Sequence, residues 1–308
     1  MSSALPQVTK VYQNHHLDST RWKHYKPRDD DIIVTTSYKS GTTWTQLIMK
    51  YLLVPDHGYK KVHDFSLWVG SRWNPIESRI NDLEAQTHRR CIKSHMALDG
   101  LPYYPQVKYI VVARDARDVF MSFYNHYANY TDAFYEDLNS IEGLIGDLLP
   151  RCTDNIHVAW ENWMTKGWFE WESEGYPFWG NLHHTKTYWD YKHLPNLLFV
   201  HFNNLLENPH AEIKRIVDYV GVDTNDAQID EIVELTSFRT MKQNSDQIVG
   251  VSPDFKGGSK TFINKGTNGR WKDVLSEDEL KLYDETVKRV LTSDCAHWLE
   301  TGQFDFNQ

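Results

Sequence analysis

The sequence predicts a single α/β domain in which helices flank a central parallel β-sheet. Four short runs rich in Val, Ile, Leu and Tyr stand apart along the chain, as expected for strands covered on both faces. Helical patterns lie between and after these runs, and strands that alternate with helices form parallel sheets with right-handed crossovers. No linker, internal repeat or low-complexity tract divides the chain, so residues 1–308 are assigned to one domain.

Each element is bounded by its own signals. The strands are predicted over Asp31–Ser37, Arg90–His95, Val107–Ala113 and Asn196–Phe202. The helices are predicted over Thr42–Leu53, Ala116–Tyr130, Asn208–Gly221 and Ser276–Leu291. The third helix has Pro209 near its start and Gly221 at its end, and the fourth opens with Ser276 and Glu279 in capping-box spacing.

The composition narrows the possible partners. A formal net charge of −9 disfavours binding to nucleic acid or anionic lipid, so a local group of donors must hold any anionic ligand. The first residues lack the apolar region of a signal peptide, and no run approaches the roughly 18 residues that a membrane helix needs. The three cysteines are too few and too far apart for a disulfide framework. We therefore expect a cytoplasmic protein with no membrane partner.

The stretch SYKSGTTW (37–44) follows the first predicted strand and departs from the Walker A pattern G-x-x-x-x-G-K-[ST]. Lys39 precedes Gly41 instead of following a glycine, and no glycine opens the loop. The free N–H groups and positive dipole end of the next helix, with two hydroxyls and the lysine, still favour an anion site. A capped helix whose lysine faces water fits the same residues equally well.

Other polar residues follow the ends of further predicted strands, where ligands bind in open α/β sheets. His95 ends the second strand, Arg114 follows the third, and Ser122 lies in the helix after it. Near the C-terminus, KGTNGRW (265–271) offers another lysine–glycine anion site. Singly, Arg114 fits a salt bridge at a helix end and His95 a buried core histidine. Together they indicate one site at one edge of the sheet.

Five motifs along the chain resemble, in sequence and in order, those of the cytosolic sulfotransferases that use 3′-phosphoadenosine 5′-phosphosulfate (PAPS). The resemblance runs from about Arg28 to Trp271, and it implies a P-loop-like sulfotransferase fold. The motifs are SYKSGTTW (37–44), where the family usually has a proline between tyrosine and lysine, then KSH (93–95), ARDARDVFMS (113–122), TSF with MK (236–242), and NKGTNGRW (264–271).

The resemblance implies transfer of a sulfuryl group from PAPS to a hydroxyl or amine of a small acceptor, with no metal required. The product nucleotide is adenosine 3′,5′-bisphosphate (PAP). By position, the resemblance implies that the 5′-phosphosulfate is held by Lys39, Ser40, Gly41, Thr42 and Thr43, and the 3′-phosphate by Arg114, Ser122, Lys265 and Gly266. Adenine is flanked by Trp44 and Phe238 and hydrogen-bonded by Thr236. His95 takes the acceptor proton, and Lys93 positions the sulfuryl group.

Three departures from the family pattern are visible. Asn264 replaces the arginine of the RKG motif and removes one bidentate grip on phosphate. Phe202 replaces a tyrosine that is often found after the fourth strand. The family's dimerisation motif is altered in Lys272–Lys281, where Glu277 and Lys281 replace its valine and its acid. We expect a monomer, or a dimer that does not use this motif.

The acceptor site is expected in aromatic loops. By the resemblance, Phe65, Trp68, Phe123 and Phe262 line it, and a phenol or another apolar alcohol fits best. Residues 1–27 are expected to contribute to the acceptor side, and residues 252–269 to form a mobile lid. The stretch Trp168–Trp189 is a candidate for part of the wall, and its adjacent histidines, His183 and His184, lack the spacing of a zinc site.

Two other functions fit part of the pattern. A P-loop-like kinase or NTPase is disfavoured by the missing GK[ST] and by the absence of an aspartate ending an apolar strand. A non-catalytic nucleotide-binding protein is disfavoured because Lys39 and His95 are both present.

Overall fold

The computed structural model of the chain describes residues 4–55 and 61–306. Its sheet has four strands, β1 (Ile32–Thr35), β2 (Cys91–Ser94), β3 (Lys108–Ala113) and β4 (Leu197–His201). They are all parallel, in the order β2-β1-β3-β4. The predicted parallel α/β fold is confirmed, and each predicted strand is shorter at its ends than expected.

The four predicted helices are also present. They are α1 (Thr42–Leu53), α4 (Ala116–Ala128), α9 (Pro209–Val220) and α14 (Glu277–Val290). Gly221 ends α9 in the left-handed conformation, and Ser276 and Glu279 form the expected capping box of α14. The remaining helical segments are η1 (Ser19–His24), α2 (Val62–Phe65), α3 (Ile76–Ala85), α5 (Asp132–Asn139), α6 (Ile156–Thr165), α7 (Asn181–Trp189), α8 (Phe202–Glu207), α10 (Asp226–Leu235), α11 (Phe238–Gln243), α12 (Ser245–Ile248), η2 (Ser252–Asp254), α13 (Ser259–Phe262), η3 (Arg270–Asp273) and α15 (Ser293–Thr301).

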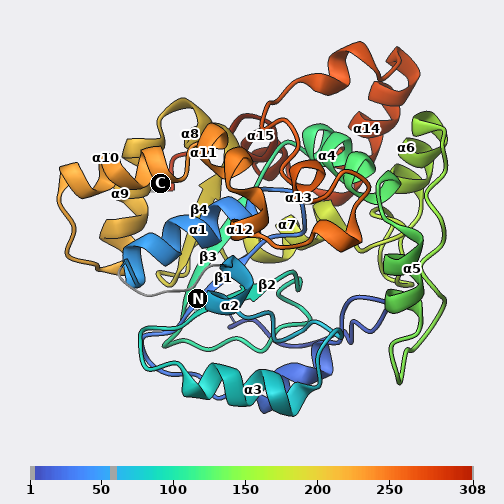
Figure 1. Cartoon of the computed structure of the whole chain (residues 1–308). Coiled ribbons are helices and arrows are strands. Elements are labelled where there is room, and N and C mark those ends of the chain that lie inside the picture. The colour runs from blue at the N-terminus through green and yellow to red at the C-terminus, as the bar shows by residue number, and fades with distance from the viewer. Residues whose placement is uncertain (1–3, 56–60, 307–308) are drawn as a thin grey trace.

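Two apolar cores lie on opposite faces of the sheet, because successive strand residues point to opposite sides. Ile32 and Val34 of β1 pack with α1, α9 and α10. Ile33 of the same strand packs with α4, α6, α14 and α15 in the other core. Figure 1 shows α9 and α10 on one side of the sheet and α4, α6 and α14 on the other.

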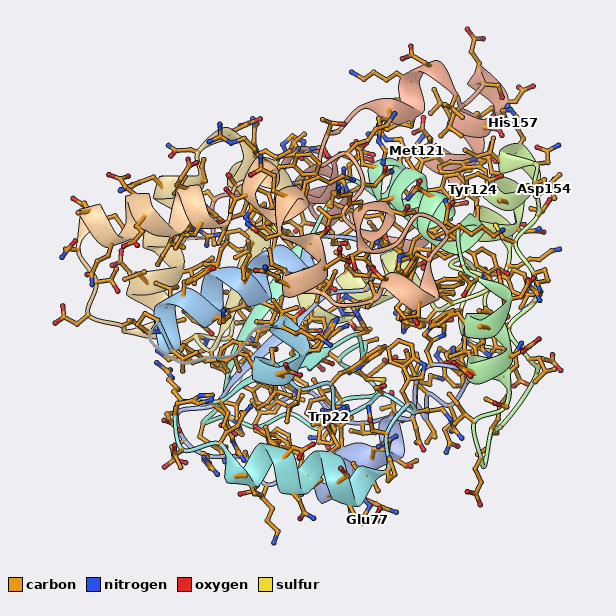
Figure 2. All side chains as sticks on the ribbon, in the orientation of Figure 1. Trp22, Glu77, Met121, Tyr124, Asp154 and His157 are labelled. Carbon is orange, nitrogen blue, oxygen red and sulfur yellow. The ribbon has the colours of Figure 1, made fainter. Side chains whose placement is uncertain are left out.

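The N-terminal segment packs beneath the sheet beside α3 (Figure 1). Trp22 of η1 is buried in the larger core, whereas Glu77 of α3 is exposed at the outer side of its helix (Figure 2). Tyr25 and Asp31 tie this segment to the sheet, since the Tyr25 hydroxyl donates to Oδ2 of Asp31 at 2.6 Å. Within residues 4–55 and 61–306, no helix is long and apolar enough to span a membrane.

Because all four strands are parallel, their carboxyl ends meet at one edge of the sheet. The segments that leave this edge are the loop after β1, His95 after β2, Arg114 after β3 and Phe202 after β4. This edge is where the sequence predicts a binding site.

Candidate active site

A cavity of about 580 Å³ opens at the carboxyl edge of the sheet. Among the described residues that line it, six are lysines or arginines, and Asp254 is the only acid. The six cations are Lys39, Arg79, Lys93, Arg114, Lys265 and Arg270. A chain of net charge −9 thus gathers positive charge at one place, as a site for an anion requires.

The loop after β1 forms one wall of the cavity. Gly41 sits before α1 with φ of 109°, a conformation that glycine adopts without strain, and it provides no side chain to cap the helix. The first N–H groups of α1 at Thr42 and Thr43 are therefore available to a ligand, at the positive end of the helix dipole. Lys39 also has positive φ, 52°, and Tyr38 anchors the loop by accepting a hydrogen bond from Trp163 at 2.7 Å.

Lys39 extends from this loop into the cavity. Its Nζ lies 3.1 Å from Nδ1 of His126 and 4.6 Å from the ring centroid of Phe262. Burial lowers the pKa of Lys39 to about 7, and repulsion from Arg114 and Lys93 adds to the effect. Burial therefore disfavours the charged form of Lys39, and an anion that enters the cavity would stabilise it.

His95 faces the cavity from the end of β2. Its Nδ1 lies 2.9 Å from the carbonyl oxygen of Thr36, and an N–H at this position donates to that carbonyl. The lone pair of Nε2 is then free to accept a proton. Burial is the main cause that lowers the pKa of His95 well below its usual value, and the charge of Lys93 adds to this effect. The ring is therefore neutral near pH 7.

Lys93 reaches the same region from within β2. Its Nζ lies 4.3 Å from the ring centroid of Trp68, and burial lowers its pKa to about 7. Trp68 also packs edge-on against His95, with centroids 4.8 Å apart. The lysine, the histidine and the tryptophan thus form one contiguous group.

Arg114 is fixed at the opposite part of the cavity. Its Nε and Nη2 donate to Oδ1 of Asn268 at 2.9 and 2.7 Å, and its guanidinium lies 4.1 Å from the Phe202 ring centroid. Asn268 is oriented in turn by a 2.6 Å hydrogen bond from its amide to Asn203. The Phe202 ring, which stands where a tyrosine was noted as usual, therefore supports Arg114 by stacking.

Phe238 and Gly266 form another part of the lining. Phe238 packs so closely on Gly266 that a Cβ at position 266 would lie 2.4 Å from Cδ2 of the ring. Trp44 and Thr236 line the cavity as well, and the Thr236 hydroxyl donates to the Ile232 carbonyl at 2.7 Å. An aromatic ring on a half-exposed surface, with a hydroxyl oxygen nearby, suits a planar heterocycle.

The structure brings most of the predicted residues together around this cavity. Those that line it are Lys39, Gly41, Thr42, Thr43, Trp44, Trp68, Lys93, His95, Arg114, Ser122, Thr236, Phe238, Phe262, Lys265 and Gly266. Ser40 is buried outside the lining, and its hydroxyl donates to the Tyr38 carbonyl at 3.0 Å.

Phe65 and Phe123 do not line the cavity, although the sequence places them there. Phe65 is fully buried at the end of α2, and the next residue, Ser66, faces the cavity. Phe123 is buried against Tyr38 and other rings, and its neighbour Ser122 faces the cavity. In each case the aromatic side chain packs into the core, and the neighbouring serine faces the cavity.

Sequence reasoning missed several lining residues. The polar ones are His16, His63, Arg79, His126, Asp254 and Arg270, and the aromatic ones include Tyr130, Phe134 and Phe178. His16 belongs to the N-terminal segment, whose contribution to the acceptor side stays a prediction. Arg270 shares a motif with Lys265, and this spacing was the available signal. Trp73 and Phe255 also line the cavity, as does Trp179 of the stretch Trp168–Trp189.

No group of three or more His, Cys, Asp or Glu side chains that could hold a metal ion occurs within the part of the chain that the structure describes. His183 bonds Asp99 instead, with Nε2 2.9 Å from Oδ2. His184 lies 3.1 Å from the Thr35 hydroxyl.

Comparisons with known proteins place this geometry in context. The family described as the sulfotransferase domain matches residues 29–294. A glycolipid sulfotransferase of Mycobacterium bovis is 26% identical, with 98% of each chain covered. Sulfotransferase 1A1 of Rattus norvegicus is 26% identical, with 86% of each chain covered.

Solved structures share the fold at lower identity. Mouse sulfotransferase SULT7A1 complexed with PAP superposes with a TM-score of 0.69 at 21% identity, covering 91% of this chain and 92% of that one. Retinol dehydratase in a complex with retinol and PAP gives a TM-score of 0.70 at 21% identity, with 94% and 89% covered.

Proposed function

The chain belongs to the sulfotransferase domain family, and on that premise we propose that it transfers a sulfuryl group from PAPS to a hydroxyl, or an amine, of a small aromatic or apolar acceptor. Both solved relatives described above were determined with PAP. The P-loop-like site of this chain offers the donors that such a nucleotide needs.

One observation carries the proposal: a single cavity joins an uncapped helix start and its lysine to a neutral histidine. The first half suits the phosphosulfate, since N–H groups and an ammonium neutralise charge on the leaving oxygen. The second half suits an acceptor, because the free Nε2 of His95 can accept its proton.

In the proposed reaction, the acceptor oxygen forms a bond to sulfur while the bond from sulfur to the 5′-phosphate oxygen breaks. The acceptor proton passes to Nε2 of His95, and PAP leaves with the electron pair of the broken bond. Lys39 and the N–H groups at Thr42 and Thr43 stabilise the charge on PAP, and Lys93 positions the sulfuryl group. No step calls on a metal.

The nucleotide is proposed to lie across the other half of the cavity. Its adenine would sit between Trp44 and Phe238, within reach of Thr236. Its 3′-phosphate would be held by Arg114, Ser122, Lys265 and the N–H of Gly266. Arg270 lines the same cavity, and its charge adds to burial in lowering the pKa of Arg114.

A thermal-shift comparison of PAP with ADP, ATP and NAD tests the nucleotide assignment. PAP is expected to raise the Tm most, because the 3′-phosphate contacts have no counterpart for the other three nucleotides. A larger shift with ATP and Mg²⁺ than with PAP would favour a kinase instead.

A further inference from the structure

One arginine that lines the cavity, Arg79, has no direct ion pair within the part of the chain that the structure describes. Arg79 of α3 lines the cavity and is half-buried. Its side chain makes no ion pair or hydrogen bond with the residues that the structure describes. Asp64 and Asp82 are near enough to raise its pKa, but burial has the larger effect and lowers it.

The surroundings of Arg79 add positive charge. Burial lowers the pKa of His63 to about 3, and the charges of Lys93 and Arg79 add to the effect, so His63 is neutral. Burial lowers the pKa of the buried Arg21, and the charges of Arg72 and Arg79 lower it further.

Arg21 and Arg72 already have polar partners within the protein. Nη2 of Arg21 donates to the carbonyl of Asn74 at 2.5 Å, and Nη1 of Arg72 lies 3.6 Å from Asp18. Each keeps a buried Nε without a partner among the described residues. Asn74 lines the cavity, so Arg21 bonds a lining residue, and Arg79 is the one arginine of these three that itself lines the cavity.

A row of aromatic rings leads from His95 toward the start of α3, the helix that carries Arg79. Trp68 packs against His95 at 4.8 Å between centroids and against Trp73 at 5.3 Å. Trp73 precedes Asn74 in the chain, and both line the cavity. An aromatic acceptor lying along this row can present a hydroxyl to His95 at one end and a second group to Arg79 at the other.

We propose that the acceptor is a hydroxyaryl acid, with its hydroxyl at His95 and its carboxylate bound by Arg79. The planar guanidinium fork matches a carboxylate in a bidentate fashion. A carboxylate would also give Arg79 the direct ion pair that Asp64 and Asp82 do not make, whereas a neutral phenol would not. The proposal rests on the proposed sulfuryl transfer and adds to it the chemical class of the acceptor.

The test compares 4-hydroxyphenylacetate with its methyl ester, which has the same ring and hydroxyl but no charge. With PAPS, the wild-type kcat/KM is expected to be at least tenfold higher for the acid, mainly through KM. Arg79→Met is expected to remove this preference, and Arg79→Lys to restore part of it. The matched control is Arg289→Met on the exposed face of α14, away from the cavity, which should keep the wild-type ratio.

Binding is measured separately from transfer. Quenching of tryptophan fluorescence by the acid in the presence of PAP reports occupancy near Trp68 and Trp73, and Arg79→Met should weaken it at least tenfold. If neither acceptor is sulfated but this binding holds, the proposed function fails and the carboxylate site stands. An acid that is no better than its ester, a ratio that survives Arg79→Met, or a stronger preference for 4-hydroxyphenyl phosphate would overturn the proposal.

Discussion

At the scale of single residues, the account depends on His95 acting as a base. Its Nδ1 is engaged with the Thr36 carbonyl, which leaves Nε2 as the proton acceptor. His95→Ala is expected to retain PAP binding and to lower kcat for an aliphatic alcohol by about 10²-fold or more. A phenol that is already ionised near neutral pH needs no base and should lose much less. Equal losses for both acceptors would contradict the assignment, and His297→Ala, at an exposed position of α15, is the control.

Lys39 gives a prediction about protons. Because burial brings its pKa to about 7, Lys39 is mostly neutral at pH 8 in the free protein and mostly charged at pH 6. A bound anion favours the ammonium and raises this pKa, so nucleotide binding should take up protons at pH 8 and few at pH 6.

Isothermal titration with PAP in buffers of different ionisation enthalpy measures this uptake. Lys93 has a similarly lowered pKa, so the uptake at pH 8 should not exceed about two protons. Lys39→Ala should lower it by up to about one proton and should also reduce kcat. Uptake that is the same at both pH values, or unchanged in the variant, would show that Lys39 is not at the anion.

Asn264 and Arg270 give the prediction most particular to this chain. Both line the cavity, and the buried Nε of Arg270 has no partner among the described residues. We expect Arg270 to supply the 3′-phosphate contact that an arginine at 264 would make. A charge-assisted hydrogen bond is worth about 1.5–3 kcal/mol, so Arg270→Met should weaken PAP binding at least about tenfold.

AMP lacks the 3′-phosphate and should bind Arg270→Met almost as well as it binds the wild type. Adding Asn264→Arg to this variant is expected to recover much of the affinity for PAP. Titration of both nucleotides decides the matter: a similar loss for AMP would place Arg270 elsewhere.

Most of the site residues predicted from the sequence line the cavity, but the sequence could not tell which side of its backbone each side chain occupies. Motif positions next to a glycine or at a strand end, such as Lys39 and His95, have little freedom to point elsewhere. Phe123 sits beside Ser122 on a helix, and only the tertiary packing decides which of them faces the ligand. Arg79 was missed because its helix, α3, contains none of the motifs. Only the tertiary fold brings this helix to the cavity.

At the scale of elements, the segment 252–269 is held over the cavity by α11. The ammonium of Lys242 donates to the carbonyls of Lys260, Ile263 and Asn264. The sequence predicted a loop here, whereas the structure shows two short helical turns, η2 and α13. The many small and polar residues of this segment do not indicate these turns. The lysine of the fourth motif thus supports the segment that carries Lys265 and Gly266.

Lys242→Met is expected to loosen this segment, because three carbonyls lose a charged donor that contributes about 1.5–3 kcal/mol. Amide hydrogen exchange should become faster across residues 259–266, and the Kd for PAP should rise by roughly tenfold. Lys260→Met, at an exposed neighbouring position, is the control. Unchanged exchange in Lys242→Met would mean that the segment is held by its apolar contacts alone.

At the scale of the whole molecule, one buried ion pair joins the N-terminal segment to the sheet. Asp31, just before β1, accepts from Nε of Arg90 at 2.7 Å and from Nη2 at 2.5 Å, and both side chains are fully buried. The strand order places these residues just before the starts of two adjacent strands, β1 and β2. Periodicity predicted that the strands exist, but strand order depends on contacts between distant segments, and no local pattern encodes them.

Asp31→Asn should destabilise the whole fold, because it leaves the Arg90 charge buried without its main partner. Breaking a buried pair costs about 3–5 kcal/mol. Urea unfolding followed by tryptophan fluorescence should show this loss, while Asp30→Asn, at an exposed position, should change stability by less than about 0.5 kcal/mol. Similar stabilities for the two variants would show that Glu84, which also accepts from Arg90, suffices.

The central claim is that the cavity carries out sulfuryl transfer from PAPS. The most direct test incubates the full chain with PAPS and a panel of phenols, with a chelator in place of added metal, and measures PAP and acceptor sulfate together. The account predicts that the two products form in equal amounts and that both are lost in Lys39→Ala. Binding of PAPS without any acceptor sulfate, or transfer from ATP and Mg²⁺ instead, would contradict it.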